Sequence, residues 1–314
     1  MADDEPLEHS PTESTGEHVS VFLDAVVAWL APNASGTYVD CTLGDGGHAA
    51  ALLTASSPSG RLLGLDADAN AVRIATERLE PFGDRAVPVQ ANFRDLANVA
   101  AAHHFRGVDG IVIDLGLSSR QLEGSGRGFS FRREEPLDMR FDPNGAETAA
   151  GILARADEEE LADLLYEYGE ERRSRRVARQ IVRRRERTPL VTTGDLVAAV
   201  VAALGPRRGR IHPATRTFQA LRIAVNDELA ALDAVLPQAA GLLAPGGRLA
   251  VISFHSLEDR RVKRFFVGGG SDAPLRPLMR RPLRPDAAEL ARNPRARSAK
   301  LRVAERMPPG QVAA

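Results

Sequence analysis

The residues best suited to chemistry gather in the stretch Thr37–Ala51. A short β-prone run there ends at Asp40 and opens into a glycine-rich turn, which an alanine-rich helical pattern follows. The turn and the first helical position supply Gly44, Gly46, Gly47 and His48. Glycines let a backbone approach a ligand closely, and a helix N-terminus offers free N–H groups. The stretch therefore predicts a ligand-binding loop.

A second acid strengthens this interpretation. Asp66 ends another apolar run, Arg61–Asp66, and lies 20 residues beyond Gly46. In nucleotide-binding α/β units, an acid at about that distance hydrogen-bonds ribose hydroxyls. The alternative is an ordinary strand-to-helix turn with an exposed acid.

Further candidates stand where other apolar runs end. Asn92 and Phe93 follow one of them, and the side chain there could cover a flat ring. Asp114 ends the next, and Ser253 and His255 follow a later one. The carboxyl ends of parallel strands meet at one edge of a sheet, so these residues are expected to face the cleft of the glycine loop. A bond from Ser253 to backbone and a structural role for His255 are the alternatives.

Metal binding is not expected. His103 and His104 have no partners at a metal-ligand spacing, and Cys41 is the single cysteine of the chain. One cysteine also excludes an internal disulfide and fits a reducing cytoplasm.

The composition is that of a globular protein with a substantial core. The chain has 314 residues, of which 43% are hydrophobic and 26% charged, and its net charge of −1 confines any nucleic-acid site to a local patch. We expect no membrane contact, because no apolar stretch approaches spanning length, and we expect no signal peptide.

Apolar runs and helical patterns alternate through the first third of the chain, which predicts an α/β fold with a doubly wound, Rossmann-like parallel sheet. The expected strands are Tyr38–Cys41, Arg61–Asp66, Ala86–Gln90, Val108–Leu115, Arg248–Ser253 and a last one, at or near the sheet edge, around Ala299–Ala304. The residues after 213 are expected to form one long helical stretch, Ala214–Leu243, broken at Pro237, and later a helix capped by Ser256.

The alternation stops between residues 123 and 213, where helical patterns prevail. We therefore predict an all-α domain, residues 123–213, inserted into a discontinuous sheet domain formed by residues 18–122 and 214–314. Asp157 and either Thr192 or Thr193 are the expected helix N-caps within the insert. Residues 1–17 are polar and acidic and are predicted to be a disordered tail.

Charge is segregated within the expected insert. Asp157–Glu171 contains eight acids and no bases, whereas Arg172–Arg187 contains nine arginines and one acid. The basic run predicts a phosphate-binding face, for which we single out Arg176, Arg183 and Arg184. The alternative is two solvated helices that exchange ion pairs. A second basic run, Arg276–Arg306, contains ten bases and three acids.

Several long motifs together resemble one family, the bacterial 16S ribosomal RNA cytosine N4-methyltransferases, also called the MraW or RsmH family. The resemblance runs from about His18 to Arg306. It is carried by Asp40 with Gly46-Gly47-His48, Asp66, Asp114-Leu-Gly-Leu-Ser-Ser, Arg127-Gly-Phe-Ser-Phe, Pro136-Leu-Asp-Met-Arg, His212-Pro-Ala-Thr-Arg-Thr-Phe-Gln-Ala-Leu-Arg-Ile, Ser253-Phe-His-Ser-Leu-Glu-Asp-Arg and Asn293-Pro-Arg-Ala-Arg-Ser.

The resemblance implies the cofactor S-adenosylmethionine, which the residues alone do not distinguish from a nicotinamide dinucleotide. By this resemblance Asp66 holds the ribose and Phe93 lies at the adenine. The family pattern usually has Pro at the position of Arg120, which leaves the path of that loop open. The implied binding residues are Gly46, Gly47, His48, Asp66, Phe93, Asp114 and Gln121.

The chemistry of the expected acceptor suggests further residues. The exocyclic amine of cytosine is a poor nucleophile, and a carboxylate that accepts its N–H bonds would favour the transition state. Asp114 and Asp138 are the candidates, although Asp114 could serve only the cofactor and Asp138 could simply pair with Arg140. Phe129 and Phe131 could sandwich an extruded cytosine, or could pack the insert against the sheet domain.

We therefore expect a cytoplasmic rRNA (cytosine-N4-)-methyltransferase, with Asp114, Asp138 and His255 as its candidate catalytic residues. By resemblance its target is position 1402 of 16S ribosomal RNA, at the decoding centre, and its partner is that RNA within the small ribosomal subunit. The rival functions are an oxidoreductase on the same fold and a non-catalytic RNA-binding module. The sequence leaves open whether a homodimer forms.

Overall fold

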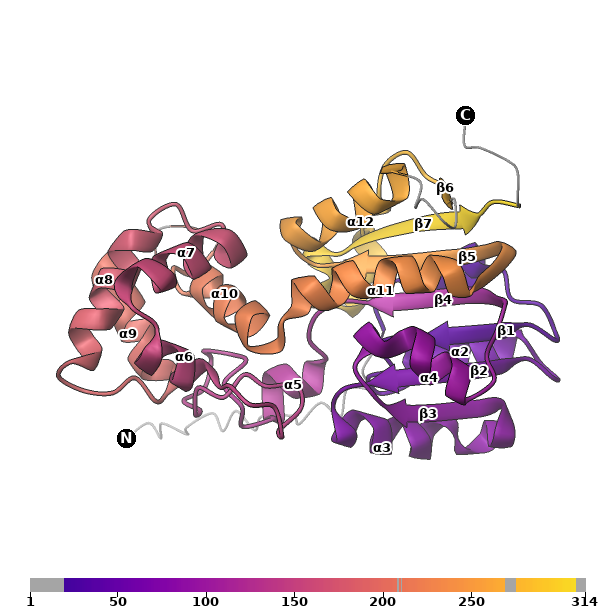
Figure 1. Cartoon of the computed structure of the whole chain (residues 1–314), viewed down its shortest axis with the longest axis horizontal. Helices are drawn as coiled ribbons and strands as arrows, with labels where there is room; N and C mark the ends of the chain where they lie inside the picture. The colour runs from indigo at the N-terminus through magenta and orange to yellow at the C-terminus, as the bar shows by residue number, and fades with distance from the viewer. Residues whose placement is uncertain (1–19, 208, 210, 269–274, 309–314) are drawn as a thin grey trace, which may run out of the picture.

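The computed structural model describes residues 20–207, 209, 211–268 and 275–308, and the tail expected at residues 1–17 lies outside them. A sheet unit and a helical unit lie side by side along the long axis of the molecule (Figure 1). None of the helices in these ranges is long and apolar enough to cross a membrane.

The sheet unit contains seven strands in the order β3-β2-β1-β4-β5-β7-β6. The first five strands are parallel and β7 is antiparallel to both of its neighbours, so the predicted doubly wound α/β sheet is confirmed. β7 is indeed one strand from the edge, whereas the three-residue edge strand β6 was not expected. The strands are β1 Thr37–Asp40, β2 Arg61–Asp66, β3 Ala86–Gln90, β4 Val108–Asp114, β5 Leu243–Ser253, β6 Leu275–Pro277 and β7 Lys300–Arg306.

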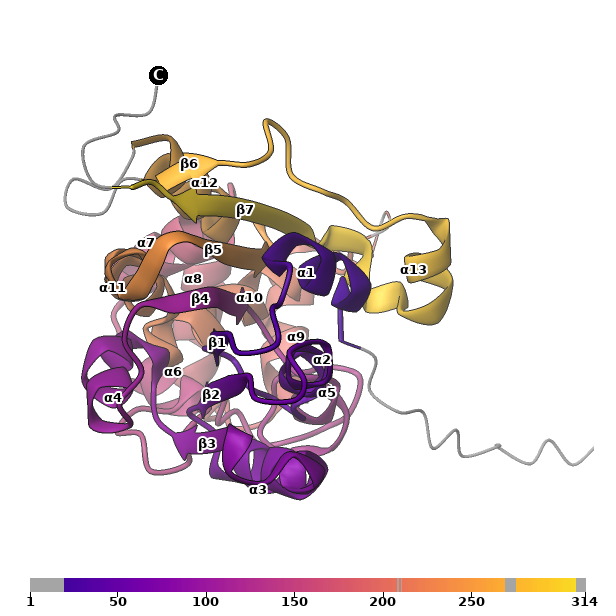
Figure 2. The same cartoon turned by 90° about the vertical axis from the view of Figure 1, so that its right-hand side faces the viewer.

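Alternating side chains of the strands feed two separate cores, one on each face of the sheet. On β4, Ile111 and Ile113 pack on the face of α4, α11 and α12, whereas Val112 packs on the face of α1 and α2. Helices cover both faces (Figure 2). They are α1 Leu23–Leu30, α2 Gly47–Ala55, α3 Ala69–Leu79, α4 Leu96–Ala102, α11 Glu228–Leu242 and α12 Ser256–Gly268, with α13 Ala287–Arg292 and the 3₁₀ turns η1 Glu80–Arg85, η2 Phe93–Asp95 and η3 Pro294–Ser298.

The helical unit has a hydrophobic core of its own. Asp157 and Thr192 are N-caps, as expected, and each forms a reciprocal capping box with the residue three positions later. The helices that follow β4 are α5 Ser119–Gly124, α6 Ala149–Arg155, α7 Glu158–Gly169, α8 Ser174–Arg185, α9 Thr193–Leu204 and α10 Thr215–Asn226.

Helix α10 packs with the helical unit, since Phe218 and Leu221 lie in its core. The sequence prediction ended the insert at residue 213. We propose instead that the helical unit extends through α10 to Asn226, and that the chain returns to the sheet unit at Asp227.

The break predicted at Pro237 is wrong. Pro237 lies inside α11, and the long helical stretch is interrupted at Asp227, whose φ of 49° and ψ of 41° end α10 and start α11. A proline removes one backbone donor, but a residue in the left-handed region turns the chain. The side chain of Gln238 also bonds the carbonyl of Ala234 at 2.9 Å, beside the proline.

Candidate functional site

A pocket lies at the carboxyl ends of β1, β2 and β4 and reaches the first turns of α5, α11 and α12. Six of the seven residues expected to bind a cofactor line it, namely Gly47, His48, Asp66, Phe93, Asp114 and Gln121. The fold therefore brings together residues that are up to 74 positions apart, from Gly47 to Gln121.

Gly46 is the residue of the predicted set that does not line the pocket. It caps α2 with a φ of 79°, and a Cβ at this position would point toward Ala75, 3.4 Å away. Gly47 has a different requirement, because a Cβ there would come within 2.1 Å of the Ser20 hydroxyl. Gly46 thus shapes the turn, while Gly47 keeps the start of α2 open toward the pocket.

The Asp66 carboxylate is fixed at the end of β2 by two backbone donors. Its Oδ2 accepts the Gly44 N–H at 2.8 Å and its Oδ1 accepts the Asp68 N–H at 2.9 Å. Burial raises the pKa of Asp66 to about 6, although both hydrogen bonds oppose that shift. The side chain therefore holds the glycine loop and still presents carboxylate lone pairs to the pocket.

Three further charged groups meet at the tips of β1 and β4. Nε2 of His48 lies 3.5 Å from Oδ2 of Asp114, and Asp40 lies below them, 1% exposed. Oδ1 of Asp114 and Oδ2 of Asp40 are buried and have no hydrogen-bond partner. Such atoms are costly to leave unpaired, so they mark a site that a polar ligand completes.

Burial and charge oppose each other in this group. Burial raises the pKa of Asp40 to about 6, with the attraction of His48 working against it. Burial lowers the pKa of His48, but the contact with Asp114 and the charges of Asp114 and Asp40 outweigh it, so the net shift is upward. The pocket floor thus holds protonatable groups before any ligand binds.

The loop after β4 is well formed in spite of Arg120. Ser118 and Gln121 form a capping box, with bonds of 3.2 and 3.0 Å, and Gln121 is buried against the pocket. Arg120 does not line the pocket, and its Nε bonds Oδ2 of Asp45, which does, at 2.9 Å. The arginine therefore leaves Gln121 at the pocket wall, as the prediction requires.

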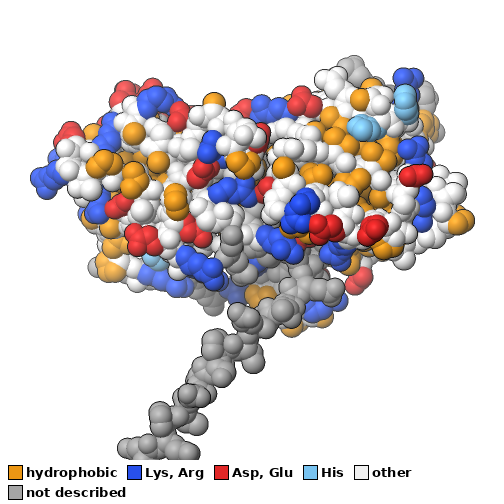
Figure 3. All heavy atoms as spheres, turned by 90° about the horizontal axis from the view of Figure 1, so that it is seen from below, with side chains coloured by type: hydrophobic (Ala, Val, Ile, Leu, Met, Phe, Trp, Pro, Cys, Tyr) orange, Lys and Arg blue, Asp and Glu red, His pale blue; other side chains and the backbone are white. Residues whose placement is uncertain are grey.

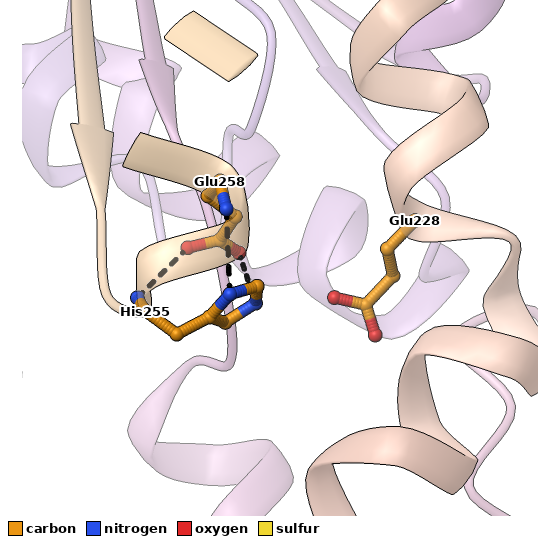
Figure 4. A group of neighbouring side chains, drawn as sticks. All are labelled: Glu228, His255 and Glu258. Atoms are coloured by element: carbon orange, nitrogen blue, oxygen red, sulfur yellow. Dashed lines mark hydrogen bonds and ion pairs between the residues drawn. The ribbon is translucent and has the colours of Figure 1, made fainter. Parts of the chain in front are cut away.

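The turn between β5 and α12 brings a second charged group to the pocket (Figure 4). His255, rather than the expected Ser256, occupies the cap position, because its Nδ1 accepts the Glu258 N–H at 3.4 Å. Oε2 of Glu258 accepts the N–H groups of Phe254 and His255 at 2.8 and 3.2 Å. Ser253 Oγ lies 3.5 Å from the Lys300 carbonyl, which is the backbone alternative considered for it.

Glu228 and Glu258 line the pocket and were not among the expected site residues. Both stand in the first turn of a helix, where acids are common because they complement the helix dipole. Their position alone therefore gave no reason to single them out.

Asp138 lies away from the pocket lining, in an ion pair. Its two oxygens accept bonds from Nε and Nη2 of Arg140 at 2.9 and 2.7 Å, and the hydrogen bond from Arg140 lowers its pKa. Because Asp138 is paired with Arg140 and does not line the pocket, the structure favours the pairing alternative for this residue.

The two phenylalanines expected at the target base are packed instead. Phe129 is 6% exposed and stacks on Phe141 with ring centroids 5.6 Å apart. Phe131 contacts His212 and Phe218, with centroids at 4.7 and 5.0 Å. These contacts favour the packing alternative, here within the helical unit, and the cytosine sandwich stays a prediction.

The arginines of α8 divide into two groups. Arg176 and Arg183 are exposed, as expected. Arg184 is not an outward residue, since its Nε is buried and its Nη2 lies 3.7 Å from Asp195. The face of the molecule in Figure 3 mixes both charges, with several basic side chains near the middle, where the two units meet.

The described pocket can be compared with known proteins. A model of the MraW methylase family matches residues 15–307. The chain belongs to this family. The match includes both parts of the sheet unit and the whole helical unit.

Relatives in the family are similar along nearly their full length. A ribosomal RNA small subunit methyltransferase H from Thermomicrobium roseum is 52% identical over 305 residues, which cover 92% of this chain and 94% of the relative. Its namesake from Sorangium cellulosum is 52% identical over 299 residues, covering 95% and 93%. Among solved structures, a putative rRNA-methylase from Clostridium thermocellum aligns with a TM-score of 0.44 and 14% identity over 91% of this chain and 95% of its own.

Proposed function

We propose that the protein transfers a methyl group from S-adenosylmethionine to the exocyclic N4 amine of a cytidine in 16S ribosomal RNA, at position 1402 in the decoding centre. Two findings carry this proposal: the chain belongs to the MraW methylase family, and it is 52% identical to relatives named ribosomal RNA small subunit methyltransferase H. The polar pocket at the carboxyl edge of the sheet agrees with it.

The pocket fits the cofactor in its donors and acceptors. Asp66 offers carboxylate lone pairs for ribose hydroxyls, and Phe93 offers a ring for the adenine. The unpartnered oxygens of Asp40 and Asp114 and both unpartnered nitrogens of His48 lie next to the glycine loop. The bound cofactor would supply a methyl group on a sulfonium, a good leaving group for in-line displacement.

Asp114 is the residue that we assign to the acceptor amine. Its backbone N–H is anchored on Thr42 Oγ1 at 2.6 Å and its Oδ2 faces His48, which leaves Oδ1 unpartnered. An oxygen fixed in this way can accept an N–H of the amine and align its lone pair with the methyl group. Alignment of two reactants can contribute about 7–11 kcal/mol.

Methylation at carbon C5 is the second candidate, and Cys41 argues against it. That reaction needs a cysteine thiolate that adds to the ring. Cys41 is 1% exposed, and burial raises the pKa of its thiol well above the ordinary value. A thiol held neutral at the end of β1 is a small packing residue, so the N4 amine is the preferred acceptor.

The large RNA partner is expected to be the assembled small subunit, met in the cytoplasm and contacted through the helical unit.

Nucleoside mass spectrometry tests the proposal directly. Small subunits from cells without the protein are incubated with the purified enzyme and labelled cofactor, and the RNA is digested. We expect one labelled N4-methylcytidine, mapped to position 1402, and the same product from Cys41→Ser. Labelled 5-methylcytidine, or no transfer to RNA, would contradict the proposal.

A further inference from the structure

A buried charge cluster lies at the junction of the two units. Arg222, on α10, holds both oxygens of Glu228, the first residue of α11, at 2.8 and 2.9 Å. Across a short gap, Nε2 of His255 lies 3.0 Å from Oε1 of Glu258. The side chains of Arg222, Glu228, His255 and Glu258 are only 14%, 11%, 11% and 3% exposed.

Figure 4 shows how the cluster is arranged. The carboxylate of Glu228 points from its own helix toward the His255–Glu258 pair. One ligand atom from each of these three residues lies within 4.8 Å of the others. Glu228 and Glu258 both line the pocket that also contains Asp114.

The charges of the cluster do not balance. Two carboxylates and one guanidinium give a net charge of −1 while His255 is neutral. Nδ1 of His255 accepts the Glu258 N–H, and the other ring nitrogen, Nε2, faces the carboxylate of Glu258. An unbalanced charge in a buried site is costly, so the cluster has capacity for one additional proton.

Glu228 is the member best placed to take that proton. Glu258 is held as an anion by two backbone donors and by His255, and its pKa is lowered. Burial raises the pKa of Glu228, against the attraction of Arg222. The remaining nearby charges, Arg94 and Asp227, pair with each other at 3.0 Å.

We propose that Glu228 is a catalytic residue of the methyl transfer, which accepts one N–H of the target amine and then takes its proton. The proposal rests on the proposed function and assigns the second N–H of the amine to Asp114. As the new N–C bond forms and the S–C bond breaks, the nitrogen becomes cationic. Its proton moves to the carboxylate of Glu228. The positive charge of Arg222 then balances the negative charge of the neighbouring Glu258.

Arg222 also decides against a metal ion in the cluster. A divalent cation bound to Glu228 would lie beside the guanidinium that pairs with this carboxylate, and the two positive charges would repel each other. His255 and Glu258 alone would supply two ligands, fewer than a protein site for zinc or manganese usually contains.

The test is a single-turnover assay on small subunits with Glu228→Gln, at saturating cofactor and RNA. Saturating cofactor is needed because Asp40 and Asp66 also titrate near pH 6 in the wild type. We expect the rate to fall about 100-fold, the size of a general-base contribution, with unchanged dissociation constants for cofactor and subunit. The acid limb of the wild-type pH–rate profile should disappear, and the residual product should still be N4-methylcytidine.

Glu158→Gln is the matched control, because Glu158 is the first residue of α7 and pairs with Arg179 at 3.1 Å on the surface. It should keep the wild-type rate. Glu228→Ala adds a second measurement, in which formate should restore part of the rate in a dose-dependent way and chloride should not.

Three results would overturn the assignment. Glu228→Gln could keep a rate within threefold of wild type with its acid limb intact. Its defect could disappear at higher subunit or cofactor concentration, which would make Glu228 a binding residue. Purified wild-type protein could contain one equivalent of a divalent metal that the variant lacks. Failure of the wild type to form N4-methylcytidine would instead count against the proposed function itself.

Discussion

At the scale of single residues, the pocket holds acids that are buried before a ligand arrives. Asp40 is fully enclosed at the end of β1, and one of its oxygens has no partner. The folded chain therefore binds a proton at Asp40 more tightly than the unfolded chain does, since its pKa is about 6 instead of 3.8. Burial of Asp40 therefore lowers the stability of the folded chain at neutral pH.

This gives a pH-dependent prediction for Asp40→Asn. Between pH 4 and 7 the folded wild type loses a proton that the unfolded chain has already lost, so wild-type stability falls as pH rises. Relative to wild type, the free energy of unfolding of the variant should rise by about 3 kcal/mol over this range and level off above pH 6. Urea unfolding in the absence of cofactor measures this difference in unfolding free energy between the variant and the wild type.

Asp24→Asn provides the control, because Asp24 is 87% exposed on α1. Its stability difference from wild type should stay constant over the same pH range. If the difference for Asp40→Asn were also constant, the carboxylate would already be ionised or solvated in the folded protein, and the description of the pocket floor would be wrong.

Individual site residues could be predicted where position alone defines their role. Asp66 and Asp114 end buried parallel strands, and such ends converge in space, so sequence reasoning found both. Phe129 and Asp138 have no such constraint, because their partners, Phe141 and Arg140, are set by the path of an irregular loop. Glu228 was missed because its role depends on contacts between two helices that are distant in sequence.

At the scale of elements, α8 has its apolar side chains on one face and its charged side chains on the other. Val177, Ala178 and Ile181 face the core of the helical unit, which turns Arg176 and Arg183 outward. A helix with one apolar stripe is expected to present its opposite face to solvent or to a partner. Arg176 and Arg183 are therefore among the exposed arginines of the basic run, which we propose to contact phosphates.

Reversing both charges tests that role. Arg176→Glu with Arg183→Glu should weaken binding to the small subunit and reduce the slope of log affinity against log salt by about 1.4–1.8, since each phosphate contact contributes about 0.7–0.9. Cofactor affinity should not change. Filter binding over a range of salt concentrations, together with calorimetry for the cofactor, measures both quantities.

Arg61→Glu with Arg106→Glu is the charge-matched control. Arg61 begins β2 and Arg106 precedes β4, so both lie at the amino edge of the sheet, opposite the pocket. The control should keep most of the wild-type slope. Equal losses for the two double variants would mean that net charge matters, and that α8 is not a specific contact.

The same scale shows why some boundaries could be predicted and others could not. Strands β2 and β4 were found because strands buried on both faces are continuously apolar, a pattern that can be detected from the local sequence. The turn at Asp227 leaves no such signal, because a left-handed aspartate looks like any helical residue in the sequence. Strand β6 has three residues and owes its pairing to β7, so only the folded sheet defines it.

At the scale of the whole molecule, the helical unit and the sheet unit have separate hydrophobic cores. The core of the helical unit includes no side chain of the seven strands. Glu170, after α7, connects this unit to α12 by bonding Ser256 and, at 2.9 Å, Nη2 of Arg260. Most pocket residues belong to the sheet unit, with Phe141 and Asn226 added from the helical side.

This division predicts that the cofactor stabilises the two units unequally. At 100 times its dissociation constant, a ligand adds about 2.7 kcal/mol to the state that binds it. Trp29, the single tryptophan, packs in a core of the sheet unit, so its fluorescence reports that unit, whereas far-ultraviolet circular dichroism follows the helices of both. The midpoint of unfolding measured by fluorescence should rise with cofactor by more than the midpoint of unfolding measured by circular dichroism.

Glu170→Ala should widen the gap between the two midpoints, because it removes the bonds to Ser256 and Arg260 that tie α7 to α12. Glu167→Ala, at an exposed position one turn earlier, should leave the gap as it is. Coincident midpoints that shift together in every variant would show that the two cores unfold as one cooperative unit. A wider gap in Glu170→Ala alone would mean that the two units are coupled through the polar contacts of Glu170 with Ser256 and Arg260.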